Sequence, residues 1–356
     1  MLDRPGDAIR RTAVEVPRAP GSTALVTGAT GFLGQWVVRR LQGAGRRVVA
    51  LTRPGRTDCP QPVREVIRES VDLRHVDGIR DVLDRHGVES VYHLAGDSTI
   101  HASRSDPTTT FSTNIEGTWS LLEACRLTPA VRSIVVASSD KAYGSSGDLP
   151  YVEDTPLLGR GPYEVSKACG DLIAQSYGVH FGVPVVVVRS GNFYGGGDLN
   201  WSRLVPGVLR AAFQGHPVQL RSDGSAVRDY VYVEDAADAF FAIESATQLR
   251  PDLRGSAFNV STRNVKSTLG FISELLEEVG SETPVVLGEP NADEIAEQWL
   301  DPSRLEQVLG WSAATPPRSA LQRTAAWYRD HVTGGSSADA LVTGAHQLQT
   351  GLSKGR

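Results

Sequence analysis

Residues 24–34 read ALVTGATGFLG, and this stretch decides the fold. A short apolar run leads into a turn with glycines at 28, 31 and 34, and an amphipathic helical pattern follows. A strand, a glycine-rich turn and a helix in this order let the backbone approach a pyrophosphate and let the helix N-terminus bind it. The alternative is a purely structural turn. We favour a dinucleotide site contacted by Gly28, Thr30, Gly31, Phe32, Leu33 and Gly34.

The alternation of strand and helix continues along the first half of the chain. Short β-branched runs predict strands at 23–27, 47–52, 90–94, 133–138 and 184–189. Helical patterns lie between them at 31–42, 76–85, 109–127 and 162–181. Strands that are apolar almost throughout are typical of a parallel sheet covered by helices on both faces. We therefore predict an α/β fold built on a doubly wound parallel Rossmann sheet.

Beyond residue 195 helical patterns dominate, beginning at 204–214, with short strand-like pieces at 218–221 and 257–260. We predict a dinucleotide-binding Rossmann domain over 22–191, to which residues 229–262 return. A smaller, mainly helical C-terminal substrate lobe follows over 192–332. Residues 1–21 and 333–356 show no periodicity, which predicts a disordered leader and a flexible tail.

Composition and charge argue against several classes of protein. The net charge is −5 and no basic stripe is present, so we expect no nucleic-acid partner. No apolar run approaches the roughly 18 residues of a membrane span, so we expect no membrane partner. The cysteines Cys59, Cys125 and Cys169 are scattered without metal-type spacing, which predicts free thiols in a reducing cytoplasm and no metal site.

Tyr163 and Lys167 are the firmest candidates for chemistry. They lie four residues apart in the helix predicted to open at Pro162, so both can reach one ligand. A free tyrosine titrates near pH ~10, but a neighbouring ammonium stabilises the phenolate, so that Tyr163 can take a hydroxyl proton at lower pH. The alternative is an ordinary pair on a helix surface. Ser138 and Ser139 close a predicted strand, and a hydroxyl at the carboxyl end of a strand can hydrogen-bond the same substrate oxygen.

Asp140 and Lys141 follow Ser139 directly and add two ionisable groups to the site expected around Tyr163 and Lys167. Such groups are costly to desolvate, so their presence indicates acid–base chemistry. Lys141 can act as a base only if burial or a neighbouring cation lowers its pKa from about 10.4. The alternative is an exposed Asp-Lys turn.

An ordered series of motifs resembles the extended branch of the short-chain dehydrogenase/reductase superfamily. After the glycine-rich turn come Asp72-Leu73, HLAG at 93–96, Asn114, Tyr163-x-x-x-Lys167, GNFYG at 191–195 and RDYV at 228–231. The resemblance implies that Lys167 binds the nicotinamide ribose. It also implies a homodimer through the helices that begin near residues 109 and 162. Further cofactor contacts implied by it are Asp72, Leu73, Leu94, Ala95 and Gly96.

The resemblance implies NAD as the cofactor, and two residues leave alternatives open. NAD enzymes usually carry an acidic residue about 20 positions beyond the glycine-rich turn, where it binds the ribose 2′-hydroxyl. Here Arg53 stands at that point with Arg56 nearby, which would suit the 2′-phosphate of NADP or be a solvated surface charge. Asp72 resembles an adenine contact and could equally cap the helix that begins near His75.

On the substrate side the resemblance implies a nucleotide sugar. Asn192 would hold its diphosphate or sugar, and Arg228 would clamp the diphosphate, because a guanidinium matches phosphate oxygens. Arg203 and Leu204 are weaker candidates, and Thr99 could line the sugar pocket. The alternative for either arginine is a surface ion pair.

The tetrapeptide SDKA at 139–142 points to the reaction. An acid followed by a base after the serine resembles nucleotide-sugar 4,6-dehydratases, whereas 4-epimerases generally have small or inert residues there. Asp-Lys resembles CDP-glucose enzymes, although the motif at 228–235 has the form shared by epimerases and TDP-glucose dehydratases.

We therefore expect a 4,6-dehydratase that turns an NDP-glucose, with CDP-glucose as one candidate, into NDP-4-keto-6-deoxyglucose. By resemblance, C4 is oxidised transiently, Lys141 removes the C5 proton, Asp140 protonates the departing C6 hydroxyl, and the hydride returns to C6. The alternatives are a 4-epimerase or C4-oxidising decarboxylase that uses only Ser139, Tyr163 and Lys167, and a cofactor-binding protein without turnover.

Overall fold

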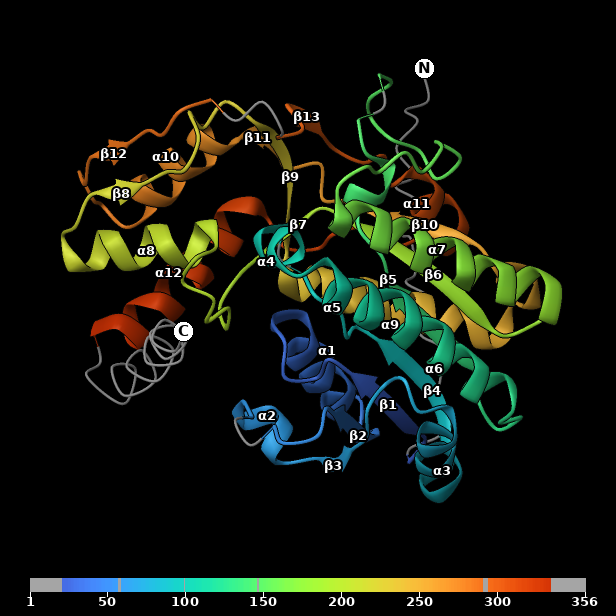
Figure 1. Cartoon of the computed structure of the whole chain (residues 1–356). Coiled ribbons are helices and arrows are strands. Elements are labelled where there is room, and N and C mark those ends of the chain that lie inside the picture. Colours follow the sequence, from blue (N-terminus) through green and yellow to red (C-terminus); the bar gives the residue numbers. More distant parts are fainter. Residues whose placement is uncertain (1–20, 57–58, 99, 146, 291–293, 334–356) are drawn as a thin grey trace, which may run out of the picture. The chain divides into compact units, whose positions relative to one another are not determined.

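The computed structural model describes residues 21–56, 59–98, 100–145, 147–290 and 294–333 (Figure 1). The predicted leader up to residue 20 and the predicted tail from residue 334 lie outside these residues. The described chain divides into two compact units. The first unit comprises 21–193, 229–265 and 297–314, and the second comprises 194–228, 266–296 and 315–333.

The first unit is built on a seven-stranded sheet in which all neighbouring strands are parallel. The order across the sheet is β10-β6-β5-β4-β1-β2-β3. In chain order these strands are β1 (Thr23–Thr27), β2 (Arg47–Thr52), β3 (Ile67–Ser70), β4 (Val88–His93), β5 (Ser133–Ala137), β6 (Val185–Ser190) and β10 (Ala257–Val260). The piece at 257–260 therefore belongs to the main sheet, as an edge strand beside β6.

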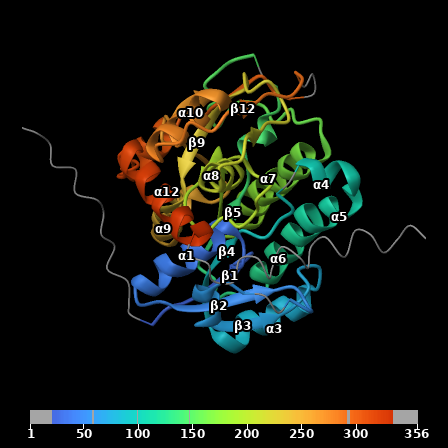
Figure 2. The ribbon, with the colours of Figure 1, turned by 90° about the vertical axis from the view of Figure 1, so that its left-hand side faces the viewer.

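The strands contribute side chains to two cores, one on each face of the sheet. In β1, Ala24 and Val26 pack with α1 (Phe32–Gly43) and α9 (Val233–Leu249), whereas Leu25 packs with α3 (Val76–His86) and α6 (Gly117–Arg126). Figure 2 shows α1 and α9 on one side of the strands and α3 and α6 on the other. Successive strand residues point to opposite faces, so a sheet covered twice needs apolar residues throughout. The predicted doubly wound parallel sheet is confirmed.

Helix α7 (Pro162–Phe181) has the bounds that the sequence predicts. Pro162 occupies the first turn, where its missing N–H costs nothing. The Glu164 carboxylate accepts from the backbone N–H groups of Arg160 at 2.8 Å and Gly161 at 3.1 Å. Gly182 ends the helix with a positive φ of 66°, which a side chain would disfavour. These signals fix the residues that α7 presents to the carboxyl end of β5.

The predicted helix at 109–127 is three consecutive pieces instead of one. They are α5 (Pro107–Phe111), a π-helical turn over Ser112–Glu116 and α6. The Asn114 amide nitrogen lies in the π turn and donates to Asp97 O at 3.0 Å and to Ser166 Oγ at 2.9 Å. Single π turns inside α-helices concentrate at functional sites. Residue periodicity does not reveal this irregularity, because the segment stays amphipathic.

The second unit is mainly helical among its described residues. Helix α8 (Leu204–Gln214) packs against α10 (Thr268–Glu278) and α12 (Pro317–Thr333), and β8 (Val218–Gln219) pairs with β12 (Val285–Val286). The strands where the chain passes between units are β7 (Asn192–Tyr194), β9 (Val227–Tyr232), β11 (Val265–Ser267) and β13 (Glu297–Gln298). Shorter helices are α2 (Gln61–Arg64), α4 (Ile100–Ser105), η2 (Asp140–Tyr143), η3 (Pro251–Leu253) and α11 (Ser303–Leu309). Within the described ranges, no helix has the length and apolar character needed to cross a bilayer.

Candidate active site

The glycine-rich turn between β1 and α1 is closed by backbone contacts that leave no room for side chains. Gly28 has a φ of 67°, and a Cβ there would lie 2.6 Å from the backbone nitrogen of Ala95. A Cβ on Gly34 would overlap the carbonyl oxygen of Gly28. Helix α1 begins at Phe32, and its N-cap Gly31 makes no side-chain capping bond. Free backbone N–H groups at the end of such a turn fit the pyrophosphate of a dinucleotide.

Leu94, Ala95 and Gly96 follow β4 and lie at the same carboxyl edge of the sheet. Their contact with Gly28 puts this segment beside the glycine-rich turn. Thr27 Oγ1 supports the segment by accepting from Ala95 N at 3.1 Å. These residues therefore stand where the resemblance puts cofactor contacts.

Arg53 and Asp72 stand after β2 and β3, at the same edge. The Arg53 side chain is exposed, and its predicted contact with a 2′-phosphate stays a prediction. The Asp72 carboxylate accepts from Arg74 Nη2 at 2.6 Å and from Arg74 Nε at 3.0 Å. These bonds lower the pKa of Asp72 to about 2. The N-cap of α3 is His75, without a side-chain bond, so the alternative in which Asp72 caps this helix is wrong.

Ser139, Asp140 and Lys141 lie immediately beyond β5 and form the start of the 3₁₀ helix η2. Ser139 is its N-cap: its hydroxyl accepts from Lys141 N at 3.2 Å and donates to Asp140 Oδ1 at 3.0 Å. Asp140 is 2% exposed and Lys141 is 9% exposed. The alternative of an exposed Asp-Lys turn is therefore wrong.

The Lys141 ammonium lies between two oxygens. It donates to Asp140 Oδ2 at 3.1 Å and to Oε1 of Gln298, which belongs to β13 and is fully buried. Gln298 Nε2 in turn donates to Asp140 O at 2.8 Å and to Gly144 O at 3.4 Å. The sequence analysis did not find Gln298, because no local motif links it to a lysine 157 residues earlier.

A third carboxyl group, that of Asp229 in β9, is buried near this pair. Neither of its oxygens has a partner in regular hydrogen-bond geometry among the described residues. Burial raises the pKa of Asp229 to about 7; Ser261 opposes the rise and the charge of Asp140 adds to it. Asp229 stands in the RDYV motif, but only the structure shows that it is close enough to Asp140 and Lys141 to feel their charges.

Tyr163 and Lys167 lie on α7, which packs against η2. The side chain of Tyr163 is 9% exposed. Lys167 Nζ donates to Ala137 O at 2.9 Å, so the lysine reaches the last residue of β5, two residues before Ser139. Burial lowers the pKa of Lys167 to about 8, against the opposing charges of Asp171 and Asp97. The structure therefore brings the predicted redox pair and the predicted acid–base pair to the carboxyl end of one strand.

Asn114 and His93 lie near Lys167. A small cavity beside Lys167 is lined among others by His93, Asn114 and Ser166. The His93 ring contacts Thr27 Oγ1 at 2.9 Å and Thr118 Oγ1 at 3.0 Å. Burial lowers the pKa of His93 to about 3, so the ring stays neutral. The sequence analysis identified Asn114 only as part of a motif. In the structure its side-chain amide donates two hydrogen bonds, to Asp97 O and Ser166 Oγ.

The predicted substrate residues divide between the two units. Asn192 opens β7 and is half-buried, whereas Thr99 lies outside the described residues. In the second unit Leu204 begins α8, and Arg203 Nη1 lies 3.1 Å from Asp198 Oδ2. The Arg228 guanidinium is buried; it donates to Glu294 Oε1 at 2.8 Å and to backbone carbonyls. Both arginines are ion-paired, but Arg228 is buried and so does not make the surface ion pair of the alternative. Their binding of substrate stays a prediction.

Comparisons with known proteins identify a family and related enzymes. The model of the NAD dependent epimerase/dehydratase family matches residues 24–260. A dTDP-glucose 4,6-dehydratase of Streptomyces griseus is 32% identical over 86% of this chain and 94% of the relative. A CDP-glucose 4,6-dehydratase of Salmonella typhimurium is 27% identical over 94% and 97%. The crystal structure of the dTDP-glucose 4,6-dehydratase DesIV from Streptomyces venezuelae, with NAD and TYD bound, has a TM-score of 0.80 and 24% identity, covering 88% of this chain and 98% of that one.

Proposed function

The chain belongs to the NAD dependent epimerase/dehydratase family, and we propose that within this family it is a nucleoside-diphosphate-glucose 4,6-dehydratase, a lyase. One observation carries the proposal: a buried carboxylate–ammonium pair, Asp140 and Lys141, lies directly after β5 and beside the helix that carries Tyr163 and Lys167. An epimerase has no need for a second acid–base pair at this point, whereas the elimination of water needs both an acid and a base.

The family cofactor, NAD, fits the glycine-rich turn. Gly28, Gly31 and Gly34 would hold its pyrophosphate, and Lys167 its nicotinamide ribose. When bound, NAD supplies a reversible hydride acceptor for the reaction. The exposed Arg53 is the residue that would decide whether a 2′-phosphate is tolerated.

Tyr163 would take the proton of the C4 hydroxyl as that carbon is oxidised. The pKa of Lys167, about 8, leaves this lysine mostly charged at neutral pH, and its ammonium favours the phenolate of Tyr163. The Ser139 hydroxyl would hydrogen-bond the same oxygen of the sugar. A ketone at C4 then makes the neighbouring C5 proton acidic.

Lys141 and Asp140 would complete the elimination after the Lys141 ammonium has passed a proton to the Asp140 carboxylate, 3.1 Å away. The neutral amine of Lys141 would then take the C5 proton, and the carboxyl group of Asp140 would protonate the departing C6 hydroxyl. The chain has 36 lysines and arginines, and only four of these are lysines: Lys141, Lys167, Lys266 and Lys354. Two of the four line the candidate site. Arginine cannot release its proton at ordinary pH, so lysine is the basic side chain that serves where a proton must move.

Asn192 would hold the nucleotide sugar, and Arg203, Leu204 and Arg228 stay further candidates that the resemblance implies. The relatives named as acting on dTDP-glucose and CDP-glucose support this substrate class. Arg228 is buried with Glu294 beside it, and a diphosphate would compete with that carboxylate for the guanidinium.

Mass spectrometry of the products from CDP-, dTDP-, UDP- and GDP-glucose tests the proposal. We expect at least one substrate to lose the mass of one water, and Tyr163→Phe to abolish the loss. A product of unchanged mass would favour a 4-epimerase. No turnover of any of the four, with Tyr163→Phe indistinguishable from wild type in the host's deoxysugar content, would favour a non-catalytic protein.

We also propose a homodimer formed through α6 and α7 that works in the cytoplasm. Leu172 and Val179 lie seven residues apart on α7 and are 56% and 67% exposed, and Trp119 on α6 is 40% exposed. Large apolar side chains gathered on two packed helices are typical of a subunit interface. The three cysteines are free, as in a reducing compartment. Light scattering after gel filtration would show a monomer if the interface is absent.

A further inference from the structure

We propose that Gln298 is a positioning residue for the elimination: its side-chain amide fixes where the Lys141 ammonium points and how readily it gives up its proton. The proposal rests on the proposed function, because it assigns Gln298 to the acid–base step. It concerns a residue 157 positions away from Lys141 in the chain, on a strand of two residues.

The orientation of the Gln298 amide is determined by its own bonds. Its nitrogen donates to two backbone carbonyls of η2 and the following turn, Asp140 O at 2.8 Å and Gly144 O at 3.4 Å. A flipped amide would put its oxygen against these carbonyl oxygens. Oε1 must therefore face Lys141, where it can only accept.

Backbone bonds hold the residues that follow Gln298. Tyr151 N donates to Trp299 O at 3.0 Å, and Asp301 N donates to Tyr151 O at 2.9 Å. Asn259 Nδ2 also donates to Tyr151 O, at 2.8 Å. Gln298 is thus held in two ways, by the hydrogen bonds of its own amide and by those of the residues that follow it. A surface glutamine would lose more side-chain entropy for the same bond.

The consequence concerns the protonation of Lys141. A lysine stem is flexible, but here its nitrogen is held between Asp140 Oδ2 and Gln298 Oε1, and both acceptors favour the charged ammonium. The charged groups that face Lys141 include Asp140 from η2 and Asp229 from β9. Gln298 is the neutral member of this set, so it can be changed to alter the charge around Lys141 without touching a reacting group.

The test compares two variants of Gln298 that should shift the pKa of Lys141 in opposite directions. Gln298→Met removes the acceptor and should lower the pKa of Lys141, whereas Gln298→Glu adds a carboxylate and should raise it. Each shift should be about one to two pH units, since a hydrogen bond to a charged group is worth roughly 1.5–3 kcal/mol and one pH unit about 1.4 kcal/mol. Both variants lose the donors to the two carbonyls, so a purely structural effect would have the same sign in both.

The direct measurement is a ¹³C NMR titration of protein labelled in lysine, without substrate. Few signals are expected from four lysines, and Lys141→Arg identifies the signal of interest. The kinetic measurement is the pH dependence of water loss. The part of the pH–rate profile that reports the protonation of Lys141 should move in opposite directions in the two variants, while KM changes less than about threefold. Glu297→Gln, on the exposed neighbour in β13, is the matched control and should leave both unchanged.

Shifts of the same sign, or none, would overturn the proposal. If Gln298→Met does not fold, a Gln298→Glu protein whose Lys141 titrates as in wild type is enough to overturn it. If wild-type protein releases water from no nucleotide sugar, the proposed function fails, whereas opposite NMR shifts would still support the link between Gln298 and Lys141.

Discussion

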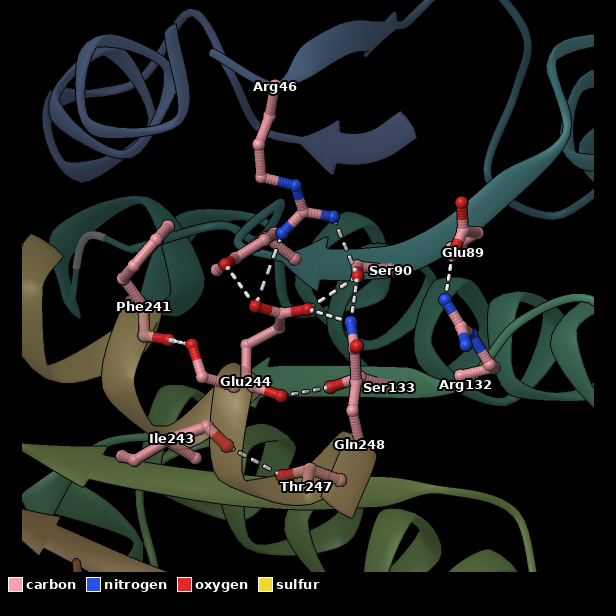
Figure 3. Close-up of polar contacts among 12 residues, drawn as sticks. Arg46, Glu89, Ser90, Arg132, Ser133, Phe241, Ile243, Glu244, Thr247 and Gln248 are labelled. Atoms are coloured by element: carbon pink, nitrogen blue, oxygen red, sulfur yellow. Dashed lines mark hydrogen bonds and ion pairs between the residues drawn. The ribbon is translucent and has the colours of Figure 1, made fainter. Parts of the chain in front are cut away.

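The first unit has one buried charged cluster near the amino ends of its sheet strands and another at their carboxyl ends. The carboxylates of the two clusters differ in how many hydrogen-bond donors they have. Near the amino ends of the strands, the Glu244 carboxylate of α9 accepts from Tyr92 Oη at 3.0 Å, Gln248 Nε2 at 2.7 Å and Arg46 Nη1 at 3.3 Å (Figure 3). Ser90 Oγ is a fourth donor. At the carboxyl ends, the donors to the Asp140 carboxylate are the Ser139 hydroxyl and the Lys141 ammonium.

Each cluster contains a glutamine, and the two glutamines have opposite hydrogen-bonding roles. Gln248 donates to the carboxylate and helps to saturate it, whereas Gln298 accepts from the cation and leaves the Asp140 carboxylate with fewer donors. The first cluster uses an arginine, which keeps its proton, and the second uses a lysine, which can release it. The Glu244 carboxylate, with donors from four side chains, fixes α9 on the sheet, although the buried Arg46 Nε has no hydrogen-bond partner among the described residues. The Asp140 carboxylate has fewer donors and the buried Asp229 near it, so it can exchange protons with a substrate.

The largest expected effect is on stability and comes from the amino-end cluster. Glu244→Ala leaves the buried Arg46 without its counter-ion and should lower the free energy of unfolding by about 3–5 kcal/mol. Activity per folded molecule should not change, because the cluster is remote from the carboxyl edge. Urea unfolding checks the first expectation and kcat the second. Asp252→Ala, which breaks an exposed pair with Arg250, is the control and should leave unfolding close to wild type.

The next effect is on turnover and comes from the carboxyl-end pair. Lys141→Met should slow water loss by about 100-fold or more, because removing a positioned acid or base typically costs that much. Its free energy of unfolding should also fall, because the buried Asp140 carboxylate loses its counter-ion, so water loss is measured per folded molecule. In single-turnover absorbance of the nicotinamide, oxidation of the sugar should persist while water loss stops. Equal losses of both steps would show that Lys141 serves the first step as well.

A further effect is a change in the slope of stability with pH. The pKa of Asp229, about 7, lies above its unfolded value near 3.8, so the folded state keeps a proton that the unfolded state has released. The contribution of Asp229 to stability is therefore full below pH ~4 and is lost as the pH rises to ~7, by roughly 1.4 kcal/mol per unit. Asp229→Asn should remove this decline. Unfolding curves at pH 5, 6 and 7 that run parallel for the two proteins would contradict the raised pKa.

The sequence predicts those features of the fold and the candidate site that depend on local residue spacing. The glycine-rich turn, the bounds of α7 and the acid–base dipeptide all follow from residues within a few positions of one another. The remainder depends on pairings that no local pattern encodes. Glu244 meets Arg46 across 198 residues, and Gln298 meets Lys141 across 157. The π turn around Asn114 was not predicted for another reason, because it leaves the helical periodicity of its neighbours intact.

Solvent deuterium tests the central claim most directly, since that claim is that Asp140 and Lys141 eliminate water after C4 is oxidised. The accepted nucleotide sugar is converted in deuterated water by wild type and by Lys141→Met, and the product is analysed by NMR. The account predicts a dehydrated product with solvent deuterium at C5 from the wild type, and almost none of this product from the variant. A dehydrated product without deuterium at C5, or full activity of Lys141→Met, would contradict it.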